Sequence, residues 1–382
     1  MESVSLIRCD DYGYETVRER VRLLLEPLGG MTAFVSPGER VLIKPNLLSA
    51  KEPAAAVTTH PVLVRVVAEM VRAIGCRVMI GDSPGIGSFR RVAQRSGIAA
   101  AAVESGAELV EFSETVDVNG SGLFRRITLA SPYWEADKII NLPKLKTHEM
   151  MTMTCAVKNL FGAVVGTEKA GWHLKAGTSQ ERFARLLLEI YLLKPPVLTI
   201  VDGIVAMEGN GPASGDPIAL EALIAGSNGV AVDVVAARLA GIPADLLHVE
   251  REAVRMGLAG AHPKEVHVFG AALSEFEQRP FRLPSGLDVQ FGLPGFIKNS
   301  LKAHLMARPE ADRGRCVLCG ACRDACPPAA IRIENSALTV DQRRCIRCWC
   351  CRELCPHDAM LVKRGVLLRM LSAVRRPRKS GI

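Results

Sequence analysis

Cysteine residues gather in one short segment of the chain. Nine of the twelve cysteines lie between residues 316 and 355 of the 382-residue sequence. Eight of them form two runs with the same spacing, C-x2-C-x2-C-x3-C-P. The first run is Cys316, Cys319, Cys322 and Cys326 with Pro327, and the second is Cys345, Cys348, Cys351 and Cys355 with Pro356. The two runs are an internal repeat, and each supplies four thiolates that can hold a metal centre.

Three thiolates at every third position, with a fourth four residues later, are typical of a loop that wraps a 4Fe–4S cubane. A zinc site more often uses two separated C-x2-C pairs, and a disulfide framework needs no repeated run. In such modules the fourth cysteine of each run binds the other cluster. We therefore expect two 4Fe–4S clusters, the first held by Cys316, Cys319, Cys322 and Cys355, and the second by Cys345, Cys348, Cys351 and Cys326.

Cys350 lies between two predicted ligands. It is either an inert neighbour that donates a weak S–H hydrogen bond or an alternative ligand after cluster damage. Positive charge near a cluster favours its reduced, more negative state, and several arginines surround the cysteines. This predicts a raised potential and a redox partner with an acidic docking surface. The arginines are Arg315, Arg323, Arg343, Arg344, Arg347 and Arg352.

A second set of chemically capable residues follows predicted strands in the first 270 residues. Lysines, hydroxyls and amides in these positions suit an anionic ligand such as a carboxylate or phosphate. The alternative for residues 144–159 is a solvated loop without a ligand, and for residues 207–212 a plain turn. The candidate substrate-binding residues are Lys44, Asn46, Asp82, Ser83, Lys144, Thr147, Lys158 and Asn159, and the candidate catalytic residues are Lys146, His148 and Glu208.

Within this second set, Lys146 would stabilise charge, and His148 or Glu208 would handle a proton. His173 is the other histidine of interest, although a lone histidine is more often structural than catalytic. Asp233 interrupts an apolar helical pattern, so we expect it to pair with a lysine or to cap a nearby group.

Short β-branched runs alternate with helical patterns across residues 40–270, which predicts an α/β fold with a mostly parallel sheet and helices on both faces. In such sheets ligands bind at the carboxyl ends of strands. The predicted strands are 40–43, 77–81, 138–141, 197–202, 223–225 and 265–269, with a hairpin over 116–129. The predicted helices are 60–74, 89–104 with a break near Gly97, 180–193 and 230–239.

The predicted domains are an α/β domain over 1–270, a proline-containing linker over 271–312, a small α+β ferredoxin-like two-cluster module over 313–362 and a basic tail over 363–382. A short helix is expected over 296–306. The net charge of +8 is modest and no apolar run is long enough to span a membrane. We expect a cytoplasmic protein with no specific nucleic-acid partner and at most peripheral membrane contact through the tail.

Several sequence blocks resemble the family known as domain of unknown function 362, which is iron–sulfur-associated and often carries a two-cluster module of the bacterial ferredoxin type. The resemblance implies an α/β body with important loops and names no substrate. The blocks are K-P-N-L-L at 44–48, G-D-S-P-G at 81–85, N-L-P-K-L-K-T-H at 141–148, V-K-N-L-F-G at 157–162, D-G-I at 202–204 and M-E-G-N-G-P at 207–212.

Three functions are compatible with these patterns. The first is an iron–sulfur oxidoreductase that delivers electrons to a small anionic substrate in the α/β domain. The second is a non-catalytic electron-transfer or assembly partner that docks another protein. The third is a non-redox enzyme with structural clusters. No second redox centre is evident in the body, so the sequence leaves open whether the protein is an enzyme.

Overall fold

The computed structural model describes residues 1–85, 87–166, 168–177, 179–276, 280–284 and 308–363. The chain forms two compact units, Met1–Leu283 and Pro284–Ile382. The predicted helix at 296–306 and most of the basic tail lie outside the described residues. No helix in the described ranges is long and apolar enough to cross a membrane.

The first unit, here called the α/β unit, is built on a ten-stranded sheet in the order β12-β1-β11-β10-β7-β2-β3-β4, with β8 paired to β10 and β9 to β8. The strands are β1 (Glu2–Arg8), β2 (Arg40–Pro45), β3 (Arg77–Asp82), β4 (Glu108–Glu111), β7 (Lys138–Leu142), β8 (Lys144–His148), β9 (Thr152–Thr154), β10 (Leu198–Glu208), β11 (Asp216–Gly226) and β12 (Val266–Gly270). Strands β10, β7, β2, β3 and β4 run parallel, whereas β11 is antiparallel to both β1 and β10. The predicted mostly parallel α/β fold is therefore confirmed.

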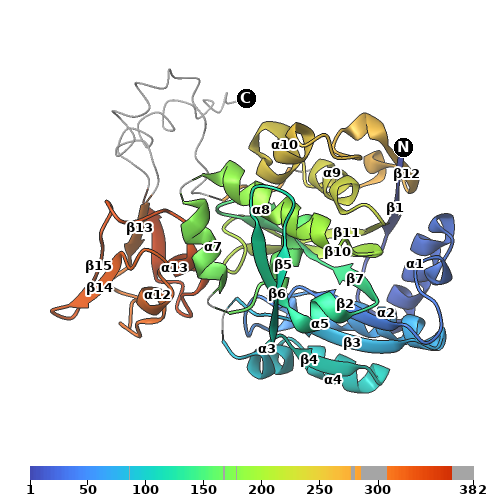
Figure 1. The fold of residues 1–382 in the computed structure, drawn as a ribbon, viewed down its shortest axis with the longest axis horizontal. Coiled ribbons are helices and arrows are strands. Elements are labelled where there is room, and N and C mark those ends of the chain that lie inside the picture. Colours follow the sequence, from blue (N-terminus) through green and yellow to red (C-terminus); the bar gives the residue numbers. More distant parts are fainter. Residues whose placement is uncertain (86, 167, 178, 277–279, 285–307, 364–382) are drawn as a thin grey trace, which may run out of the picture. The chain divides into compact units, whose positions relative to one another are not determined.

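Helices cover both faces of this sheet (Figure 1). Alternate residues of β11 enter different cores: Leu223 and Ala225 pack with α1, α2 and α4, whereas Ala222 and Ile224 pack with α9. The helices are α1 (Tyr14–Leu25), α2 (Pro61–Ala73), α3 (Phe89–Arg95), α4 (Ile98–Ser105), α5 (Ser131–Glu135), α6 (Ala156–Asn159), α7 (Glu168–Ala176), α8 (Gln180–Leu193), α9 (Gly229–Leu239) and α10 (His248–Arg255). The predicted hairpin is β5 (Thr115–Asn119) with β6 (Arg126–Ala130).

Local sequence explains where the main helices begin. Asn228 caps α9, since its Oδ1 accepts hydrogen bonds from the amides of Val230 (2.9 Å) and Ala231 (3.2 Å). Ser179 caps α8 in the same way, by accepting from the amide of Arg182 at 3.1 Å. These caps satisfy amides that have no partner within the helix.

The α/β unit extends past the predicted boundary at residue 270. Phe276 and Phe281 are buried in the core beside α9, and Arg282 forms an ion pair with Glu208. Apolar burial therefore ties residues 271–276 and 280–283 to the α/β unit, although the prolines of the sequence favoured a linker here.

The second unit is here called the C-terminal unit, and its described residues 308–363 form two small antiparallel sheets and two single-turn helices. Its β13 (Arg308–Ala311) pairs with β16 (Met360–Lys363), and β14 (Ile331–Glu334) pairs with β15 (Ala337–Val340). Helices α12 (Ala321–Asp324) and α13 (Cys350–Glu353) each follow the first two cysteines of a run. Because β13 is paired with β16, the folded unit starts before the predicted residue 313.

Candidate functional site

Two cavities in the C-terminal unit gather the cysteines of the repeat. Cys316, Cys319, Cys322 and Cys355 line one cavity, and Cys326, Cys345, Cys348 and Cys351 line the other. Each cavity therefore takes three cysteines from one run and the fourth from the other. The spacing predicts the same crossed grouping for the cluster ligands, and that assignment stays a prediction.

The backbone around the cavities repeats with an offset of 29 residues, the separation of Cys316 and Cys345. Leu318 and Arg347 both have positive φ, at 56° and 55°. The amides of Ala330 and Ala359 donate to the sulfurs of Cys326 and Cys355, each at 3.2 Å. Left-handed residues bend the loop around the cavity, and N–H···S bonds stabilise a thiolate. The donor set and its backbone thus fit two four-thiolate clusters.

Burial, with smaller contributions from the nearby Cys355 and Cys316, raises the pKa of the Cys322 thiol to about 11. Burial also raises the pKa of the Cys351 thiol well above its ordinary value. A cation is therefore needed to keep these sulfurs deprotonated at neutral pH, as iron would do.

Cys350 occupies the repeat position of Ala321, the first residue of α12. It is buried but does not line either of these two cavities. Its place in the repeat is therefore that of a packing residue, which favours the inert interpretation.

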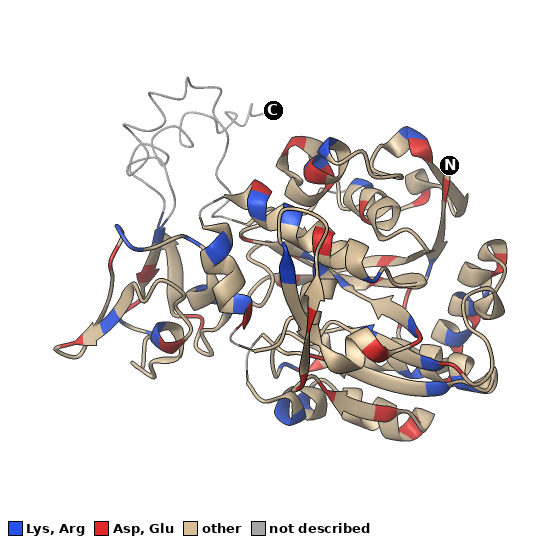
Figure 2. Cartoon of the chain, viewed as in Figure 1, with Lys and Arg blue, Asp and Glu red and all other residues tan. Residues whose placement is uncertain are grey.

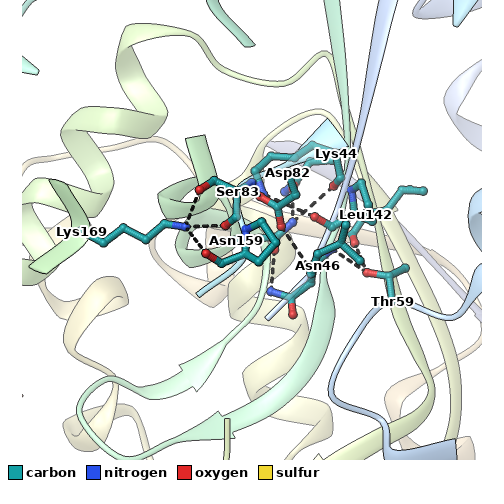
Figure 3. A network of polar contacts seen from close by, with 12 residues as sticks. Lys44, Asn46, Thr59, Asp82, Ser83, Leu142, Asn159 and Lys169 are labelled. Carbon is teal, nitrogen blue, oxygen red and sulfur yellow. Dashed lines mark hydrogen bonds and ion pairs between the residues drawn. The ribbon is translucent and has the colours of Figure 1, made fainter. Parts of the chain in front are cut away.

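In the α/β unit, a buried polar network lies at the carboxyl ends of β2, β3 and β7 (Figure 3), and it also includes Lys144 and Lys146 of β8 and Asp202 of β10. Lys44 at the end of β2 forms an ion pair with Asp82 at the end of β3, with Nζ 2.8 Å from Oδ1. Asp82 Oδ2 also accepts from the amide of Leu47 at 2.9 Å. Both charged side chains are almost fully buried, so the Lys44 charge is neutralised internally.

Lys144 is neutralised in the same way. Its Nζ donates to Asp202 Oδ2 and to the hydroxyl of Tyr12, both at 2.9 Å. The Tyr12 hydroxyl donates to Asp202 Oδ1 at 2.6 Å, and its ring stacks on His60 at 3.6 Å. The predicted anion-binding role of Lys44 and Lys144 is thus replaced by internal ion pairing.

Three asparagines connect the strand ends through a chain of side-chain amides. Lys146 Nζ donates to Asn46 Oδ1 (2.8 Å) and to the Val57 carbonyl (2.7 Å). Asn46 donates to Asn159, and Asn159 donates to Asn141, each at 2.8 Å. The structure therefore brings together the predicted residues Asn46, Lys146 and Asn159, but as a connected buried scaffold. The solvated-loop alternative for this segment is excluded, because β8 is buried along its whole length.

Ser83 is tied to a lysine that sequence reasoning missed. Lys169 on α7 donates to Ser83 Oγ at 3.1 Å, to the Pro84 carbonyl at 3.2 Å and to the Ser83 carbonyl (Figure 3). Burial lowers the pKa of Lys169 to about 7, with Lys44 and Lys158 opposing its charge and Asp82 favouring it. The glycine-rich sequence around Lys169 contains no pattern that separates a buried lysine from a solvent-exposed one, so Lys169 could not be predicted.

Glu208 and Thr147 form hydrogen bonds with residues 282 and 209. Glu208 Oε1 lies 2.8 Å from Arg282 Nε, and Glu208 Oε2 accepts from the Arg282 amide at 2.8 Å. This ion pair favours an ionised carboxylate, which is a poor proton donor. Thr147 Oγ1 donates to the Gly209 carbonyl at 2.9 Å and so secures the adjacent loop.

His148 lies at the end of β8 and is buried with a neutral ring. Burial lowers the pKa of His148 well below its usual value, and nearby Lys158, His173 and Lys146 lower it further. Its Nδ1 accepts hydrogen bonds from the amides of Met150 (3.1 Å) and Met151 (3.2 Å). His148 is therefore not an imidazolium acid at neutral pH.

Asp233 caps α6, the helix that carries Lys158 and Asn159. Its carboxylate accepts from the amides of Ala156 (2.6 Å) and Val157 (3.1 Å). Of the two predicted roles, pairing with a lysine and capping, the structure confirms capping.

Comparisons with known proteins agree with this two-unit description. Residues 41–238 match the domain of unknown function DUF362, and residues 308–356 match a 4Fe-4S dicluster domain. The chain is 38% identical over 312 residues to the thylakoid-associated protein sll1697 of Synechocystis sp., covering 79% of this chain and 94% of that protein. The lactate racemase apoprotein from Thermoanaerobacterium thermosaccharolyticum aligns with a TM-score of 0.43 at 10% identity, over 61% of this chain and 56% of that one. The chain therefore belongs to the DUF362 family and carries an iron–sulfur domain of the 4Fe-4S dicluster type.

Proposed function

We propose that the protein transfers electrons through two 4Fe–4S clusters with crossed ligands. The first cluster would be held by Cys316, Cys319, Cys322 and Cys355, and the second by Cys326, Cys345, Cys348 and Cys351. The observation that carries this proposal is that each of two cavities gathers four sulfurs from both halves of the repeat. The clusters would supply one-electron chemistry.

Metal analysis and spectroscopy test the proposal. Anaerobically purified protein should contain about eight iron and eight sulfide per chain. Cys355→Ala should damage the cluster of the first run and Cys326→Ala that of the second, as seen by electron paramagnetic resonance after reduction. Cys350→Ala is the matched control and should leave both signals. Zinc with little sulfide contradicts the proposal. Loss of only the second-run cluster in Cys355→Ala, or of only the first-run cluster in Cys326→Ala, contradicts the crossed ligation.

The redox partner would present an acidic surface around its own centre. Residues 308–363 contain ten Lys or Arg and seven Asp or Glu, which is a net charge of +3 from side chains before cluster binding. Basic and acidic residues are interleaved on this unit (Figure 2), so the attraction would be moderate. Electron transfer to an acidic carrier should therefore slow with rising salt, and a rate independent of salt would contradict this docking mode.

We further propose that the α/β unit binds a small anionic substrate, which would make the protein an oxidoreductase. With Lys44 and Lys144 neutralised, the support comes from basic residues around His148 at the end of β8. Lys158, His173 and Lys146 each lower the pKa of His148; Lys146 and His173 are buried and Lys158 is half-buried. The non-catalytic docking partner remains the alternative, because no second redox centre is identified in the described residues of the α/β unit.

A metabolite screen separates these two alternatives. The protein is reduced anaerobically, and small organic acids are tested for reoxidation of the clusters. A substrate should reoxidise them with saturation, and Lys158→Ala should slow this reaction while both cluster spectra stay intact. Reoxidation only by protein carriers favours the docking partner.

The cellular location is proposed to be cytoplasm-facing, with at most peripheral membrane contact. The Synechocystis relative is named as thylakoid-associated, and this chain has a basic sequence at 363–382 that suits an anionic surface. A salt wash should release any membrane-bound fraction, whereas retention until detergent is added would contradict peripheral contact.

A further inference from the structure

The two cysteine-lined cavities of the C-terminal unit differ in how much of their rim is exposed to solvent. The cavity that contains Cys319 is here called the first cavity, and the one that contains Cys348 is called the second cavity. Four lining residues of the first cavity are exposed, namely Val317, Cys319, Pro356 and His357. Two of them belong to the first cysteine run, and two follow the last cysteine of the second run. Both halves of the repeat therefore build this exposed rim.

The equivalent positions of the second cavity are less exposed. The repeat offset of 29 residues pairs the four exposed residues with Ile346, Cys348, Pro327 and Pro328. Of these equivalents Cys348 is buried, and the other three are half-buried. Pro309 of β13 adds to the wall of the second cavity, and its carbonyl accepts from Gln342 Nε2 at 3.2 Å. The second cavity thus presents less of its rim to an approaching molecule.

Cys319 marks the open side of the first cavity. It is exposed, whereas Cys322 in the same cavity is buried. The rate of electron transfer falls steeply with the distance between two centres, so a redox partner gains most by approaching from the side of Cys319. Val317 lies at this side and is 61% exposed, although it is apolar. An apolar residue at the centre of a docking patch, with charges at the edge, is typical of protein–protein interfaces.

Arginines lie at one edge of this rim. The Arg323 guanidinium lies against Gly320, since a Cβ atom there would meet Nη2 at 3.1 Å, and Gly320 lines the first cavity. Residues 312–324 hold three arginines and two aspartates, which is a net side-chain charge of +1. Asp358 follows His357 at the other edge. Carboxylates of a partner are therefore expected to lie toward the arginines, and this charge pattern would orient the partner on the rim.

We propose that the protein exchanges electrons with its redox partner at the first cluster, and that the partner docks on the exposed rim of the first cavity. The inference rests on the proposed electron-transfer function and identifies where the contact is made. The partner is a one-electron carrier protein with an apolar patch over its own centre and carboxylates at the edge of that patch. When it is the donor, the carrier loses one electron and the first cluster gains it, and the second cluster can then receive the electron from the first.

A kinetic test uses the full chain with both clusters, and a reduced acidic ferredoxin of the plant type as the probe. Val317→Asp replaces the apolar contact with a carboxylate, so reduction of the clusters should slow about tenfold in second-order rate. Arg323→Gln removes one charge at the edge and should slow it about threefold, with a weaker dependence on salt. Val103→Asp is the control, because Val103 is 80% exposed on α4, and it should react like the wild type.

A spectroscopic test compares the solvent access of the two clusters without any partner. A soluble dysprosium chelate speeds the electron spin relaxation of a centre that it can approach closely. The signal that remains in Cys326→Ala, which should keep the first cluster, should respond more strongly than the signal that remains in Cys355→Ala. An equal or stronger response of the second cluster overturns the choice of the first cluster as the point of exchange.

Iron and sulfide analysis separates the remaining outcomes. If Val317→Asp and Arg323→Gln keep both clusters and react at the wild-type rate, the docking face is overturned. If Val317→Asp fails to bind clusters, Arg323→Gln decides alone. A wild type that holds its clusters but does not react with the acidic ferredoxin overturns the carboxylate-bearing partner. A wild type without about eight iron and eight sulfide overturns the proposed electron-transfer function itself.

Discussion

Two buried lysines of the α/β unit, Lys44 and Lys144, each form an ion pair with one carboxylate. Burial lowers the pKa of both Lys44 and Lys144, while Asp82 and Asp202 act in the opposite direction. The contact between Lys144 and Asp202 also includes the Tyr12 hydroxyl, so three groups depend on one another. Removing one partner of such a pair leaves an uncompensated buried charge.

Lys144→Met should therefore destabilise the protein by about 3–5 kcal/mol, because Asp202 would remain buried without its cation. The measurement is the free energy of unfolding in urea. Lys264→Met, at an exposed position, is the control and should change it by less than about 0.5 kcal/mol. Adding Asp202→Asn to Lys144→Met should recover part of the loss. Equal effects of Lys144→Met and Lys264→Met would show that the pair is not structural.

These lysines also show what the sequence can reveal about single residues. The cysteines stand out as predicted ligands because their spacing is local and typical of loops that bind a cluster. Lys144 stood out as a cation, but its partner Asp202 lies 58 residues away and carries no signal that links the two. Sequence therefore located the polar strand ends and could not tell a ligand contact from an internal ion pair.

At the scale of elements, the segment after α6 must pass very close to the Lys44–Asp82 pair. A Cβ atom at Gly162 would overlap Asp82 Oδ1 and crowd Lys44 Nζ. The Gly162 carbonyl also accepts from the Ser83 amide at 3.3 Å, which ties this segment to the end of β3. Only glycine fits between these elements without moving them.

Gly162→Ala should consequently cost about 1–3 kcal/mol of stability through overpacking. Gly171→Ala is a matched control, since Gly171 lies within α7 and a Cβ there would meet no atom within 4 Å. That substitution should be neutral or stabilise by up to about 1 kcal/mol. Thermal unfolding of both variants gives the comparison, and an unchanged melting temperature for Gly162→Ala would contradict the close approach.

Helix α10 brings a second carboxylate close to the Asp233 cap. Burial, with a contribution from Asp233, raises the pKa of Glu250 to about 8 from its ordinary value of 4.5. Burial also raises the pKa of Asp233. Between the ordinary and raised pKa values the folded state binds more protons than the unfolded state, so stability falls as pH rises.

The wild type should lose up to about 1.4 kcal/mol per pH unit from Glu250 between about pH 6 and 8. Glu250→Gln keeps the neutral form at every pH and should flatten this slope. The free energy of unfolding in urea at several pH values measures it, with Glu108→Gln at an exposed position as the control. A slope unchanged by Glu250→Gln would place the proton elsewhere.

Some helices and strands could be predicted from the sequence more accurately than others. Helix α8 has the predicted bounds, because its apolar face and its Ser179 cap are both local signals. Strand β8 was expected as a loop, because Lys144, Lys146 and His148 follow the strand predicted at 138–141. In the structure these residues form a buried strand, and Lys144 and Lys146 donate to Asp202 and Asn46, which are distant in the sequence.

At the scale of the whole molecule, the two units differ in what holds them together. The α/β unit has two extensive apolar cores, one on each face of its sheet. The described part of the C-terminal unit has nine buried apolar residues, and three of these are predicted cluster ligands. The nine are Cys322, Ala330, Ile331, Cys348, Trp349, Cys350, Cys351, Ala359 and Met360. A unit this small rarely folds on apolar burial alone, so cluster binding would supply much of its folding free energy.

Iron depletion should therefore unfold one unit and spare the other. Full-length protein produced without iron, or stripped of it by a chelator, should lose protection from proteolysis between residues 308 and 363. The α/β unit should resist, because its cores contain none of the predicted ligands. Limited proteolysis with mass spectrometry would then yield a stable fragment ending near Leu283, the boundary of the first unit.

Reconstitution with iron and sulfide should restore both the protection from proteolysis and the visible absorption of a cluster. Addition of zinc should not restore both. A C-terminal unit that stays protected without metal would show that its strands and helices fold without the clusters.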